Sequence, residues 1–206
     1  QPQCMIGNNH HLSPLPGEDF QMFEKDLPGE NKSGLSYQQA SDKLPVETCE
    51  TINNSWGFNI TDTTYKTHEQ LLQYLVKGAG LGVNFLLNIG PMPNGEIQPE
   101  FVERLHWMGE WLRVYGESVY KTNAGYLKPQ SWGCMTQKDN KIYLHVFDSQ
   151  RASVILEQFP FKKISKAYLL KDKTSVKTQL KNGMAQLFLP ENDNEPDEVI
   201  VLEVKN

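Results

Sequence analysis

The first half of the chain contains two segments in which apolar residues recur at helical spacing. The first segment is expected at about residues 67–78, where Thr67 and Gln70 fit a capping box at the amino end. Gly78 and Gly80 are expected to stop this helix. Its predicted buried stripe consists of Leu71, Leu72, Leu75, Val76 and Ala79.

A short apolar run, Val83 to Ile89, follows the first helix. Because nearly every position is apolar, the run predicts a strand covered on both faces, as in a parallel sheet. A turn-rich loop at residues 90–95 leads to a second helix that is expected to start at Pro99 and to end near Gly116. The order helix, strand, loop, helix is typical of an α/β fold, whose sites are usually built at the carboxyl ends of strands. The predicted buried face of the second helix consists of Phe101, Leu105, Met108, Leu112 and Tyr115.

Residues 126–206 follow a different pattern, made almost entirely of short strand candidates separated by turn signals. Asn182-Gly183 between two of these candidates predicts a hairpin. Regular strand spacing without a helical pattern predicts a β-sandwich. The six predicted strands are Lys141–Phe147, Ala152–Leu156, Ala167–Leu170, Val176–Leu180, Ala185–Leu189 and Val199–Val204.

These patterns together predict an α/β plus all-β chain with two domains. Residues 1–124 are expected to form the C-terminal part of a (β/α)8-like barrel, and residues 125–206 an antiparallel β-sandwich domain. A complete barrel of this kind needs about 250 residues, so only about half of one is expected here. The chain begins at Gln1 with neither an initiator Met nor a signal pattern, and we therefore expect it to begin inside a longer protein.

Composition narrows the classes of partner. The 206 residues are 38% hydrophobic and 22% charged, which indicates a packed core rather than wholesale disorder. The net charge of −5 argues against a nucleic-acid partner, because such proteins usually carry a basic face. No apolar run approaches the roughly 20 residues that cross a bilayer, so no membrane partner is predicted. Cys4, Cys49 and Cys134 are far apart and odd in number, which favours small buried thiols over a zinc site or a disulfide framework.

The segment from Asn8 to Asn31 is long, polar and rich in Pro and Gly, and it is predicted to be a functional loop. It could supply an acid, a base or a metal ligand. Metal binding is disfavoured because His10 and His11 are adjacent and would point to opposite faces of a strand. The ionisable residues of the segment are His10, His11, Glu18, Asp19, Glu24, Asp26 and Glu30.

Aromatic residues lie close to carboxylates in this part of the sequence. Sugars stack their apolar C–H faces on aromatic rings, so Trp56 and Phe58 are candidates for a sugar site. Core packing is the alternative for both rings, and a solvated charge is the alternative for each acid. Glu47 lies on a strand-like run at residues 45–52, where it could point into a barrel mouth as a general acid or form a paired structural glutamate.

Several longer motifs occur in the first 125 residues. They are Phe85-Leu86-Leu87-Asn88-Ile89-Gly90-Pro91, Asn94-Gly95-Glu96-Ile97, Gly109-Glu110-Trp111-Leu112, Gly116-Glu117-Ser118-Val119-Tyr120, Glu47-Thr48-Cys49 and Ser55-Trp56-Gly57-Phe58. Together they resemble the motifs of family 29 α-L-fucosidases, which have a leucine-rich strand ending in Asn-Ile-Gly-Pro. The tail of the chain is similar to that family only in length and strand content.

The resemblance implies a retaining glycosidase, in which two carboxyl groups roughly 5–5.5 Å apart act as nucleophile and as acid/base. The family's nucleophile is an Asp shortly after a Trp, on a strand upstream of these motifs. An acid does not stand two residues after any tryptophan of this chain, so the nucleophile is expected to be absent from it. The tryptophans are Trp56, Trp107, Trp111 and Trp132.

The family's acid/base lies in a variable loop of the type Asp-Tyr-x-x-x-Glu. Asp19 to Glu24 matches this spacing with Phe20 in place of Tyr, so the resemblance implies Glu24 as the acid/base, with Glu47 as the alternative. Trp56 would line the pocket near the C5 methyl group of fucose, and Asn88 is expected to order the end of its strand. His10 takes the place of an Arg found in many relatives. The substrate-binding residues implied are His10, His11, Asp19 and Trp56.

The resemblance thus implies an α-L-fucosidase that acts on fucosylated oligosaccharides or glycoprotein glycans. It is expected to need no cofactor and no metal, to work only with the missing N-terminal half of the same protein, and to be periplasmic or secreted. Two alternatives stay open. The chain could be a non-catalytic carbohydrate-binding or structural module, or it could be inert and aggregation-prone alone because strand edges are left unpaired.

Overall fold

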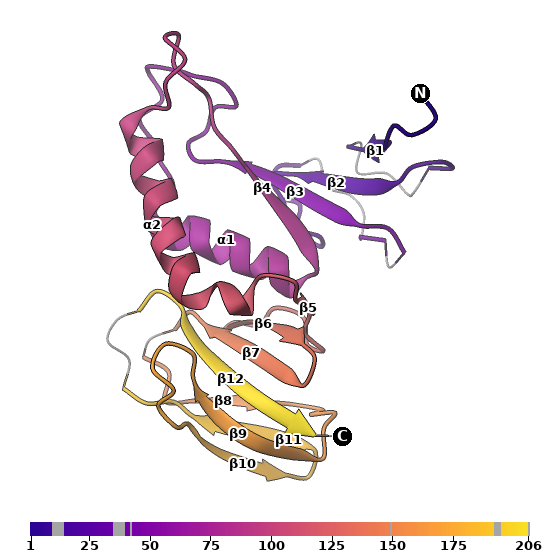
Figure 1. Cartoon of the computed structure of the whole chain (residues 1–206), viewed down its shortest axis with the longest axis vertical. Coiled ribbons are helices and arrows are strands. Elements are labelled where there is room, and N and C mark those ends of the chain that lie inside the picture. Colours follow the sequence, from indigo (N-terminus) through magenta and orange to yellow (C-terminus); the bar gives the residue numbers. More distant parts are fainter. Residues whose placement is uncertain (10–14, 35–39, 42, 149, 192–194, 206) are drawn as a thin grey trace. The chain divides into compact units, whose positions relative to one another are not determined.

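The computed structural model describes residues 1–9, 15–34, 40–41, 43–148, 150–191 and 195–205 (Figure 1). The chain divides into two compact units. The first unit contains residues 1–78 and 82–108, and the second contains residues 79–81 and 109–206. The predicted domain boundary at residue 124 stays a prediction.

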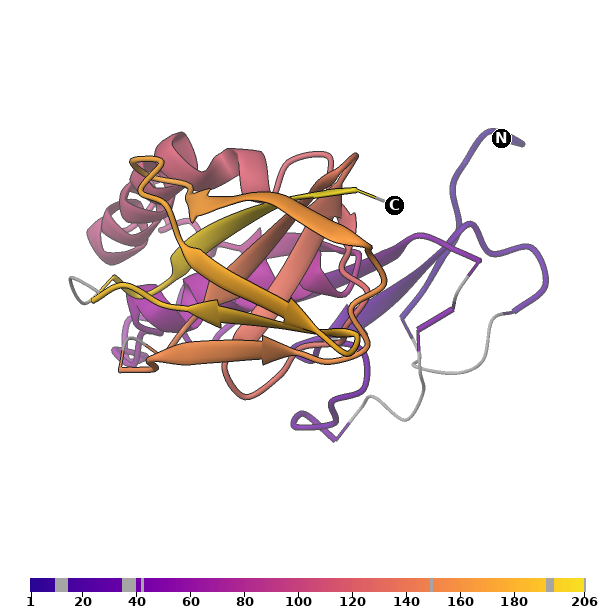
Figure 2. The ribbon, with the colours of Figure 1, turned by 90° about the horizontal axis from the view of Figure 1, so that it is seen from below.

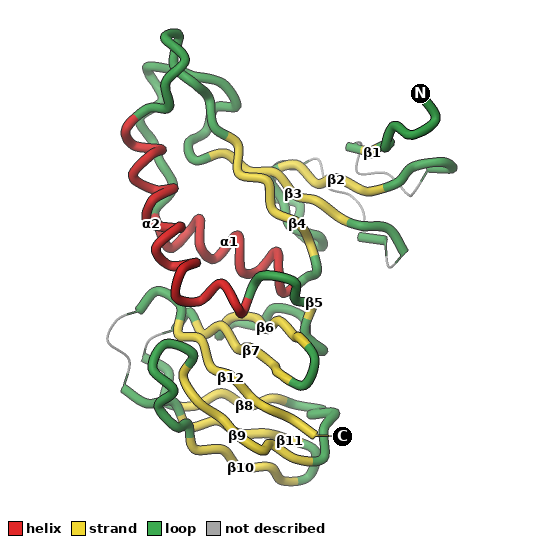
Figure 3. Tube along the Cα trace, viewed as in Figure 1, coloured by secondary structure: helices red, strands yellow, loops and turns green. Residues whose placement is uncertain are grey.

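The first unit is built on a parallel sheet in the order β1-β2-β3-β4 (Figure 3). Its strands are β1 Gly7–Asn8, β2 Phe20–Glu24, β3 Val46–Thr51 and β4 Val83–Asn88. Strand β4 confirms the strand predicted from Val83 to Ile89. It was also predicted to be covered on both faces, but Asn84 and Leu86 are exposed in the described chain. Strands β1 and β2 lie inside the segment from Asn8 to Asn31 or at its edge, so the prediction of one long loop there was wrong. The physical reason is that Phe23, at the centre of the segment, is buried on this sheet and orders it.

Helix α1, His68–Gly80, follows the predicted start closely. The Gln70 backbone N–H donates to the Thr67 hydroxyl at 3.2 Å, and the Thr67 backbone N–H donates to the Gln70 side-chain oxygen at 2.8 Å. These two reciprocal bonds confirm the capping box. Of the two glycines predicted to stop the helix, Gly78 lies within it and Gly80 is its last residue. The chain then reverses at Gly82, where φ is +72°.

Helix α2, Pro99–Tyr115, is followed by a short 3-10 helix, Gly116–Ser118. Within the first unit its amino-terminal part contributes to a core with α1 and the sheet. The buried members of that core are Ile52, Leu71, Phe101 and Met108. Tyr74 of α1 packs on Phe85 of β4 with ring centres 5.0 Å apart, and its hydroxyl lies 3.0 Å from the Thr48 hydroxyl on β3. One face of the parallel sheet is therefore covered by helices.

The second unit contains two antiparallel sheets, which Figure 2 shows from a second direction. One has the strand order β5-β6-β7-β12-β9 and the other β10-β11-β8. The strands are β5 Asn123–Ala124, β6 Gly133–Lys138, β7 Lys141–Val146, β8 Ser153–Leu156, β9 Lys163–Leu169, β10 Lys177–Lys181, β11 Met184–Phe188 and β12 Glu198–Lys205. Residues of both sheets share one apolar core, which is consistent with the predicted β-sandwich. The core includes Met135, Leu144, Leu156, Leu187 and Leu202.

All six strands predicted in the tail are present with small shifts at their ends. The largest shift is in β9, which begins at Lys163 instead of Ala167. Strand β6 was not predicted, because Cys134, Thr136 and Gln137 carry no clear alternation of apolar and polar residues. Asn182 and Gly183 have φ values of +51° and +72°, which confirms the hairpin between β10 and β11.

The cysteine prediction was correct for one residue of the three. Cys134 is buried, Cys49 is half-buried, and Cys4 is exposed. The exposure of Cys4 contradicts the expectation of buried thiols, because residues 1–7 lie at the surface of the described chain. Within the residues that the structure describes, no helix has the length and apolar character that a membrane span requires.

Candidate active site

The carboxyl ends of the parallel strands meet at one edge of the sheet, and β2 and β3 bring the two candidate acids to the same face. Register pairs Glu24 with Cys49, and Met22 with Glu47. Because paired residues of parallel strands point to the same side, Glu24, Cys49 and Glu47 share a face. That face is opposite Phe23 and Thr48, which are buried on the helix side. We call the side defined by Glu24, Glu47, Cys49, Asn84 and Leu86 the open face, because its members are half-buried or exposed.

Glu24 is the last residue of β2 and lies at the carboxyl edge of the open face. Its side chain is half-buried and accepts a hydrogen bond from the Asn9 amide at 3.3 Å. The resemblance implied a loop position for the acid/base. The structure corrects this expectation, because Glu24 ends a regular strand. A strand end restricts the carboxylate more than a free loop does, which suits a group that must meet a reacting atom.

Glu47 lies deeper in the sheet than Glu24. It is the second residue of β3, and its neighbours in register are Met22 on β2 and Asn84 on β4. Glu24 pairs two residues further along β3, so Glu24 is about 6–7 Å closer to the carboxyl edge. Both carboxylates face the same side, and only Glu24 lies at the edge where sites of parallel α/β folds are built.

Cys49 lies close to carboxylates on both faces of the sheet. Burial raises the pKa of the Cys49 thiol above its ordinary value, and the nearby carboxylates of Glu24, Glu47 and Glu50 raise it further. The thiol therefore stays protonated, and its Sγ donates to the Phe23 carbonyl at 3.6 Å. This result places both candidate acids within electrostatic reach of one point on the open face.

Trp56 lies in the loop that follows β3, and 39% of its surface is exposed. The Asn88 side-chain amide, at the end of β4, donates to the Trp56 carbonyl at 2.7 Å. The Lys25 ammonium lies 5.1 Å from the centre of the indole ring. The structure thus agrees with the expectation that Asn88 orders its strand end, and core packing, the alternative weighed for Trp56, does not apply.

Gly90 is the point at which the Asn-Ile-Gly-Pro segment comes close to the backbone of the Ser-Trp-Gly-Phe segment. A Cβ atom at Gly90 would lie 2.4 Å from the Gly57 carbonyl carbon and 2.5 Å from the Phe58 nitrogen. Both are backbone atoms that cannot move aside cheaply. The Trp56–Phe58 segment therefore rests directly on the end of β4, where only glycine leaves enough space.

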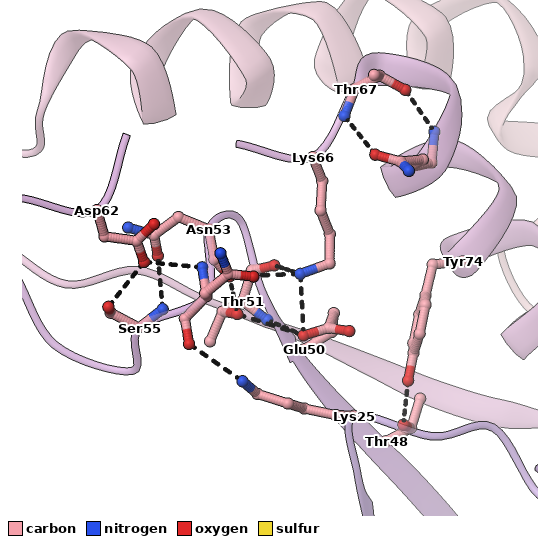
Figure 4. Close-up of polar contacts among 12 residues, drawn as sticks. Lys25, Thr48, Glu50, Thr51, Asn53, Ser55, Asp62, Lys66, Thr67 and Tyr74 are labelled. Carbon is pink, nitrogen blue, oxygen red and sulfur yellow. Dashed lines mark hydrogen bonds and ion pairs between the residues drawn. The ribbon is translucent and has the colours of Figure 1, made fainter. Parts of the chain in front are cut away.

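A partly buried polar network holds the start of the loop that follows β3 (Figure 4). Glu50 is buried on the helix side of β3, and its carboxylate accepts from the Lys66 ammonium at 3.2 Å. The same ammonium donates to the Thr51 carbonyl at 2.7 Å and to the Asn53 carbonyl at 3.3 Å. The charge on Lys66 therefore pairs with Glu50 and also orders the first turn of the loop after β3.

The outer part of the same loop is tied together by Asp62 (Figure 4). Its carboxylate accepts from the Ser55 hydroxyl at 2.7 Å and from the Asn54 backbone N–H at 3.0 Å. The hydrogen bond from Ser55, followed by those from backbone N–H groups, lowers the pKa of Asp62 below its ordinary value. Asp62 is ionised at neutral pH and holds the two residues that precede Trp56.

The other predicted substrate-binding residues are distributed differently. Asp19 is exposed, and its carboxylate accepts from the Ile6 backbone N–H at 2.7 Å, so it fastens the chain next to β1. His10 and His11 lie outside the described residues. Among the described residues, no group of three or more His, Cys, Asp and Glu side chains gathers where a metal ion could be held.

Two residues of this region were not found from the sequence, Lys25 and Asn9. Lys25 has a left-handed backbone, with φ of +59°, and its ammonium reaches the loop of Trp56. The sequence gives no sign of this left-handed backbone, because a lysine that follows the polar end of a strand usually continues in an ordinary conformation. Asn9 could have been noticed as an amide beside the two histidines, but its partner Glu24 is 15 residues away.

A family model described as alpha-L-fucosidase matches residues 1–117, which include every residue of the candidate site. The chain belongs to the alpha-L-fucosidase family. Plasma alpha-L-fucosidase of Homo sapiens is 38% identical over 107 residues, with 47% of this chain and 22% of that protein covered. Alpha-L-fucosidase of Branchiostoma floridae is 37% identical over 108 residues, with 50% of this chain and 24% of that protein covered. The chain therefore spans about a quarter of the length of these family members.

Solved structures of the family extend the likeness to the sandwich. Alpha-L-fucosidase isoenzyme 1 from Paenibacillus thiaminolyticus superposes with a TM-score of 0.78 at 30% identity, covering 92% of this chain and 46% of that structure. An alpha-L-fucosidase of family GH29 from Bacteroides thetaiotaomicron superposes with the same TM-score at 24% identity, covering 92% of this chain and 45% of that one, and shows the fold. The described sheets and helices thus occur together in known members of the family.

Proposed function

We propose that this chain carries the acid/base side of a retaining α-L-fucosidase that releases L-fucose from glycans. The observation that carries the proposal is the family match over residues 1–117, which coincides with the edge where Glu24 and Trp56 lie. An acidic group beside an exposed indole is the composition of a sugar site, because the ring stacks on C–H groups while the acid serves the glycosidic oxygen.

In the proposed reaction, an aspartate on a segment upstream of this chain attacks the anomeric carbon of fucose. The bond between that carbon and the glycosidic oxygen breaks while Glu24 transfers its proton to the leaving oxygen. Water then enters, Glu24 takes one of its protons, and the resulting hydroxide displaces the aspartate. Fucose leaves with its original anomeric configuration, and both carboxyl groups return to their starting states.

Glu24 is assigned this role in preference to Glu47 because of its position on the sheet. It ends β2 at the carboxyl edge, whereas Glu47 is the second residue of β3. Half-burial keeps the Glu24 carboxyl accessible to a substrate, and the amide of Asn9 orients it. Glu47 would then shape the interior of the sheet beneath the sugar.

Trp56 is proposed to form the wall of the sugar pocket near the C5 methyl group of fucose. Its backbone is held by Asn88 and by the close approach to Gly90, which fixes the ring before substrate arrives. His10 and His11 follow Asn9 directly in the chain, and we propose that they bind sugar hydroxyls. Asp19 would act indirectly, by fastening the strand that precedes these histidines.

The parallel sheet is proposed to be part of a (β/α)8 barrel that an N-terminal half of the same protein completes. Leu86 on the open face is 45% exposed, and barrel closure would cover it.

In the Bacteroides thetaiotaomicron relative, a trapped covalent intermediate with 2-fluoro-fucosyl fluoride was obtained using a glutamate-to-glutamine mutant. The same two-step route is proposed here, with fucosylated oligosaccharides or glycoprotein glycans as substrates and a periplasmic or secreted location.

The carbohydrate-binding alternative needs a row of exposed aromatic rings on the sandwich. Trp132, Tyr143 and Phe159 are buried instead. The remaining candidates in the tail, Tyr126, Phe147, Phe161, Tyr168 and Phe188, are only partly accessible. A flat stacking platform is therefore not formed by these eight rings, and the enzyme proposal is favoured.

The test compares Glu24→Gln and Glu47→Gln in the full-length protein that carries these 206 residues. With the acid removed, a fucoside with a poor leaving group should lose about 10²–10⁴-fold in kcat/KM, while an activated aryl fucoside should lose much less in its first step. Azide should rescue Glu24→Gln on the aryl substrate. Equal losses on both substrates would remove Glu24 from the role, and the differential loss in Glu47→Gln instead would transfer the role to Glu47. The 206-residue chain alone should show no turnover.

A further inference from the structure

Lys25 directly follows Glu24 and has an unusual backbone. Its φ of +59° lies in the left-handed region, which carries an energetic cost for a non-glycine residue. Glycine would adopt this conformation without that cost. The backbone alone would favour glycine at this position, so a contribution of Lys25 has to come from the contacts of its side chain.

The main chain of Lys25 continues the pairing of β2 with β3. Its backbone N–H donates to the Cys49 carbonyl at 2.9 Å, one step beyond the register pair of Glu24 and Cys49. The left-handed turn therefore occurs while the strand is still attached to its neighbour. The direction that the Lys25 side chain takes is set by the sheet itself.

The side chain of Lys25 reaches the loop of Trp56 at two points. Its ammonium donates to the Asn54 carbonyl at 3.2 Å, the bond drawn from Lys25 in Figure 4. The same ammonium lies 5.1 Å from the centre of the Trp56 indole. A cation at this distance from an indole is attracted by the negative face of the ring. The ring is still 39% exposed, so surface remains for a ligand.

We propose that Lys25 is a positioning residue that holds the Trp56 ring at a set place relative to Glu24. The inference rests on the proposed function. One peptide bond connects Glu24, the proposed acid/base, to Lys25, whose ammonium contacts the Trp56 ring. The placement of the sugar against Trp56 and the placement of the leaving oxygen at Glu24 are therefore fixed by the same short segment, residues 24–25.

The proposal makes Lys25 act on binding more than on proton transfer. Replacing it by methionine keeps most of the length of the side chain and removes its charge and donor. In the full-length protein, Lys25→Met should raise KM for an aryl fucoside about 3–10-fold with a smaller change in kcat. Lys25→Arg keeps a cation over the ring and should restore KM to within about 2–3-fold of wild type.

A matched control exists in Lys121, which is exposed and also left-handed, with φ of +58°. It follows the 3-10 helix of the second unit and takes no part in the proposed site. Lys121→Met should leave KM and kcat unchanged. Lys25→Gly and Lys121→Gly both relax the backbone, so a KM effect in Lys25→Gly alone would come from the lost side chain.

A readout independent of turnover is ¹⁹F NMR of the full-length protein labelled with 5-fluorotryptophan, with the Trp56 signal assigned by Trp56→Phe. Lys25→Met should shift and broaden that signal, and Lys25→Arg should restore it. An unchanged signal in Lys25→Met overturns the proposal, and so does a changed signal with an unchanged KM. If the wild-type protein cleaves no fucoside, the proposed function fails, and the NMR comparison alone decides whether Lys25 sets the position of Trp56.

Discussion

The parallel sheet of the first unit and the sandwich of the second unit bury their strands differently. In the parallel sheet, one face packs on helices through residues such as Phe85, while the open face keeps Glu24, Glu47 and Leu86 accessible. In the sandwich, the inner faces of both sheets share one core that includes Leu144 and Leu187. In the described part of the chain, the candidate site therefore lies on the sheet that has one face without covering elements.

The two regions also use buried polar groups for different purposes. In the first unit, Lys66 pairs with Glu50 and also donates to the Thr51 and Asn53 carbonyls, so it supports the edge where the candidate site lies. In the second unit, His145 and Asp197 are fully buried and 2.7 Å apart. They join β7 to the chain just before β12, and their role is to hold the sandwich together.

The largest effect is expected from breaking the His145–Asp197 pair. His145→Leu leaves the Asp197 carboxyl buried without its partner and should lower the free energy of unfolding by about 3–5 kcal/mol. Chemical denaturation followed by circular dichroism measures this change. Asp197→Asn, which keeps a polar partner for His145, should cost less. A cost of His145→Leu below that of Asp197→Asn would contradict the proposed role of the pair.

The loss of unfolding free energy caused by His145→Leu should depend on pH. Burial raises the pKa of Asp197 above its ordinary value, and the neighbouring His145 partly offsets that rise. A raised carboxyl pKa contributes stability that is present below the ordinary value of 3.8 and is lost as the pH rises through the shifted value. Without His145 the offset disappears, so His145→Leu should be more destabilising at pH 7 than at pH 4.

An intermediate effect is expected from truncating one leucine in each region. Leu187 is fully buried in the sandwich, and Leu187→Ala should cost about 2–5 kcal/mol of unfolding free energy. Leu86 is 45% exposed, and Leu86→Ala should cost less than about 1 kcal/mol in the 206-residue chain. In the full-length protein, where the proposed barrel covers the open face, the cost of Leu86→Ala should rise toward that of Leu187→Ala. The same small cost in both forms would argue against barrel closure over Leu86.

The smallest effect is expected at Glu117, whose carboxylate accepts from Lys141 at 2.8 Å and from the Tyr143 hydroxyl at 2.9 Å. The hydrogen bond from Lys141, followed by that from Tyr143, lowers the pKa of Glu117. A lowered carboxyl pKa contributes stability that is present above the ordinary value of 4.5 and is lost as the pH falls through the shifted value. Because the side chain is 44% exposed, solvent screens the pair, and Glu117→Gln should cost less than about 1 kcal/mol at pH 7.

Thermal unfolding of wild type and Glu117→Gln at pH 7 and pH 3 measures this difference. The difference between the two proteins should shrink as the pH falls from 7 to 3, because the wild-type carboxyl becomes increasingly protonated. Glu110→Gln, which removes an exposed ion pair with Arg113, is the control for the loss of one surface charge. A difference that does not shrink between pH 7 and pH 3 would mean that the amide introduced by Glu117→Gln fails to replace the acceptor of Tyr143, not that the ion pair stabilises the fold.

Local patterns in the sequence were sufficient for most elements. The capping box of Thr67 and Gln70 predicted the start of α1, and Asn182-Gly183 predicted the β10–β11 hairpin, because both signals act within a few residues. Strands β2 and β6 were missed for the opposite reason. Their order depends on neighbours that are distant in sequence, such as β3 beside β2.

For the candidate site, too, the sequence was sufficient for some features and not for others. Its residue types, including Glu24, Glu47 and Trp56, could be predicted from motifs and family resemblance. Their arrangement could not, since the pairing of Glu24 with Cys49 spans 25 positions and the bond from Asn88 to Trp56 spans 32. Nothing in the sequence indicated that Lys25 adopts a left-handed backbone and reaches the indole.

The sequence by itself therefore determined most of the elements, the family and the candidate acids. The tertiary structure decided which acid stands at the carboxyl edge, what holds Trp56, and why Gly90 must lack a side chain. The physical reason is the range of the forces involved. Helix caps and tight turns satisfy backbone hydrogen bonds among near neighbours, whereas strand register, close backbone approach and cation–π contact exist only after distant segments have packed together.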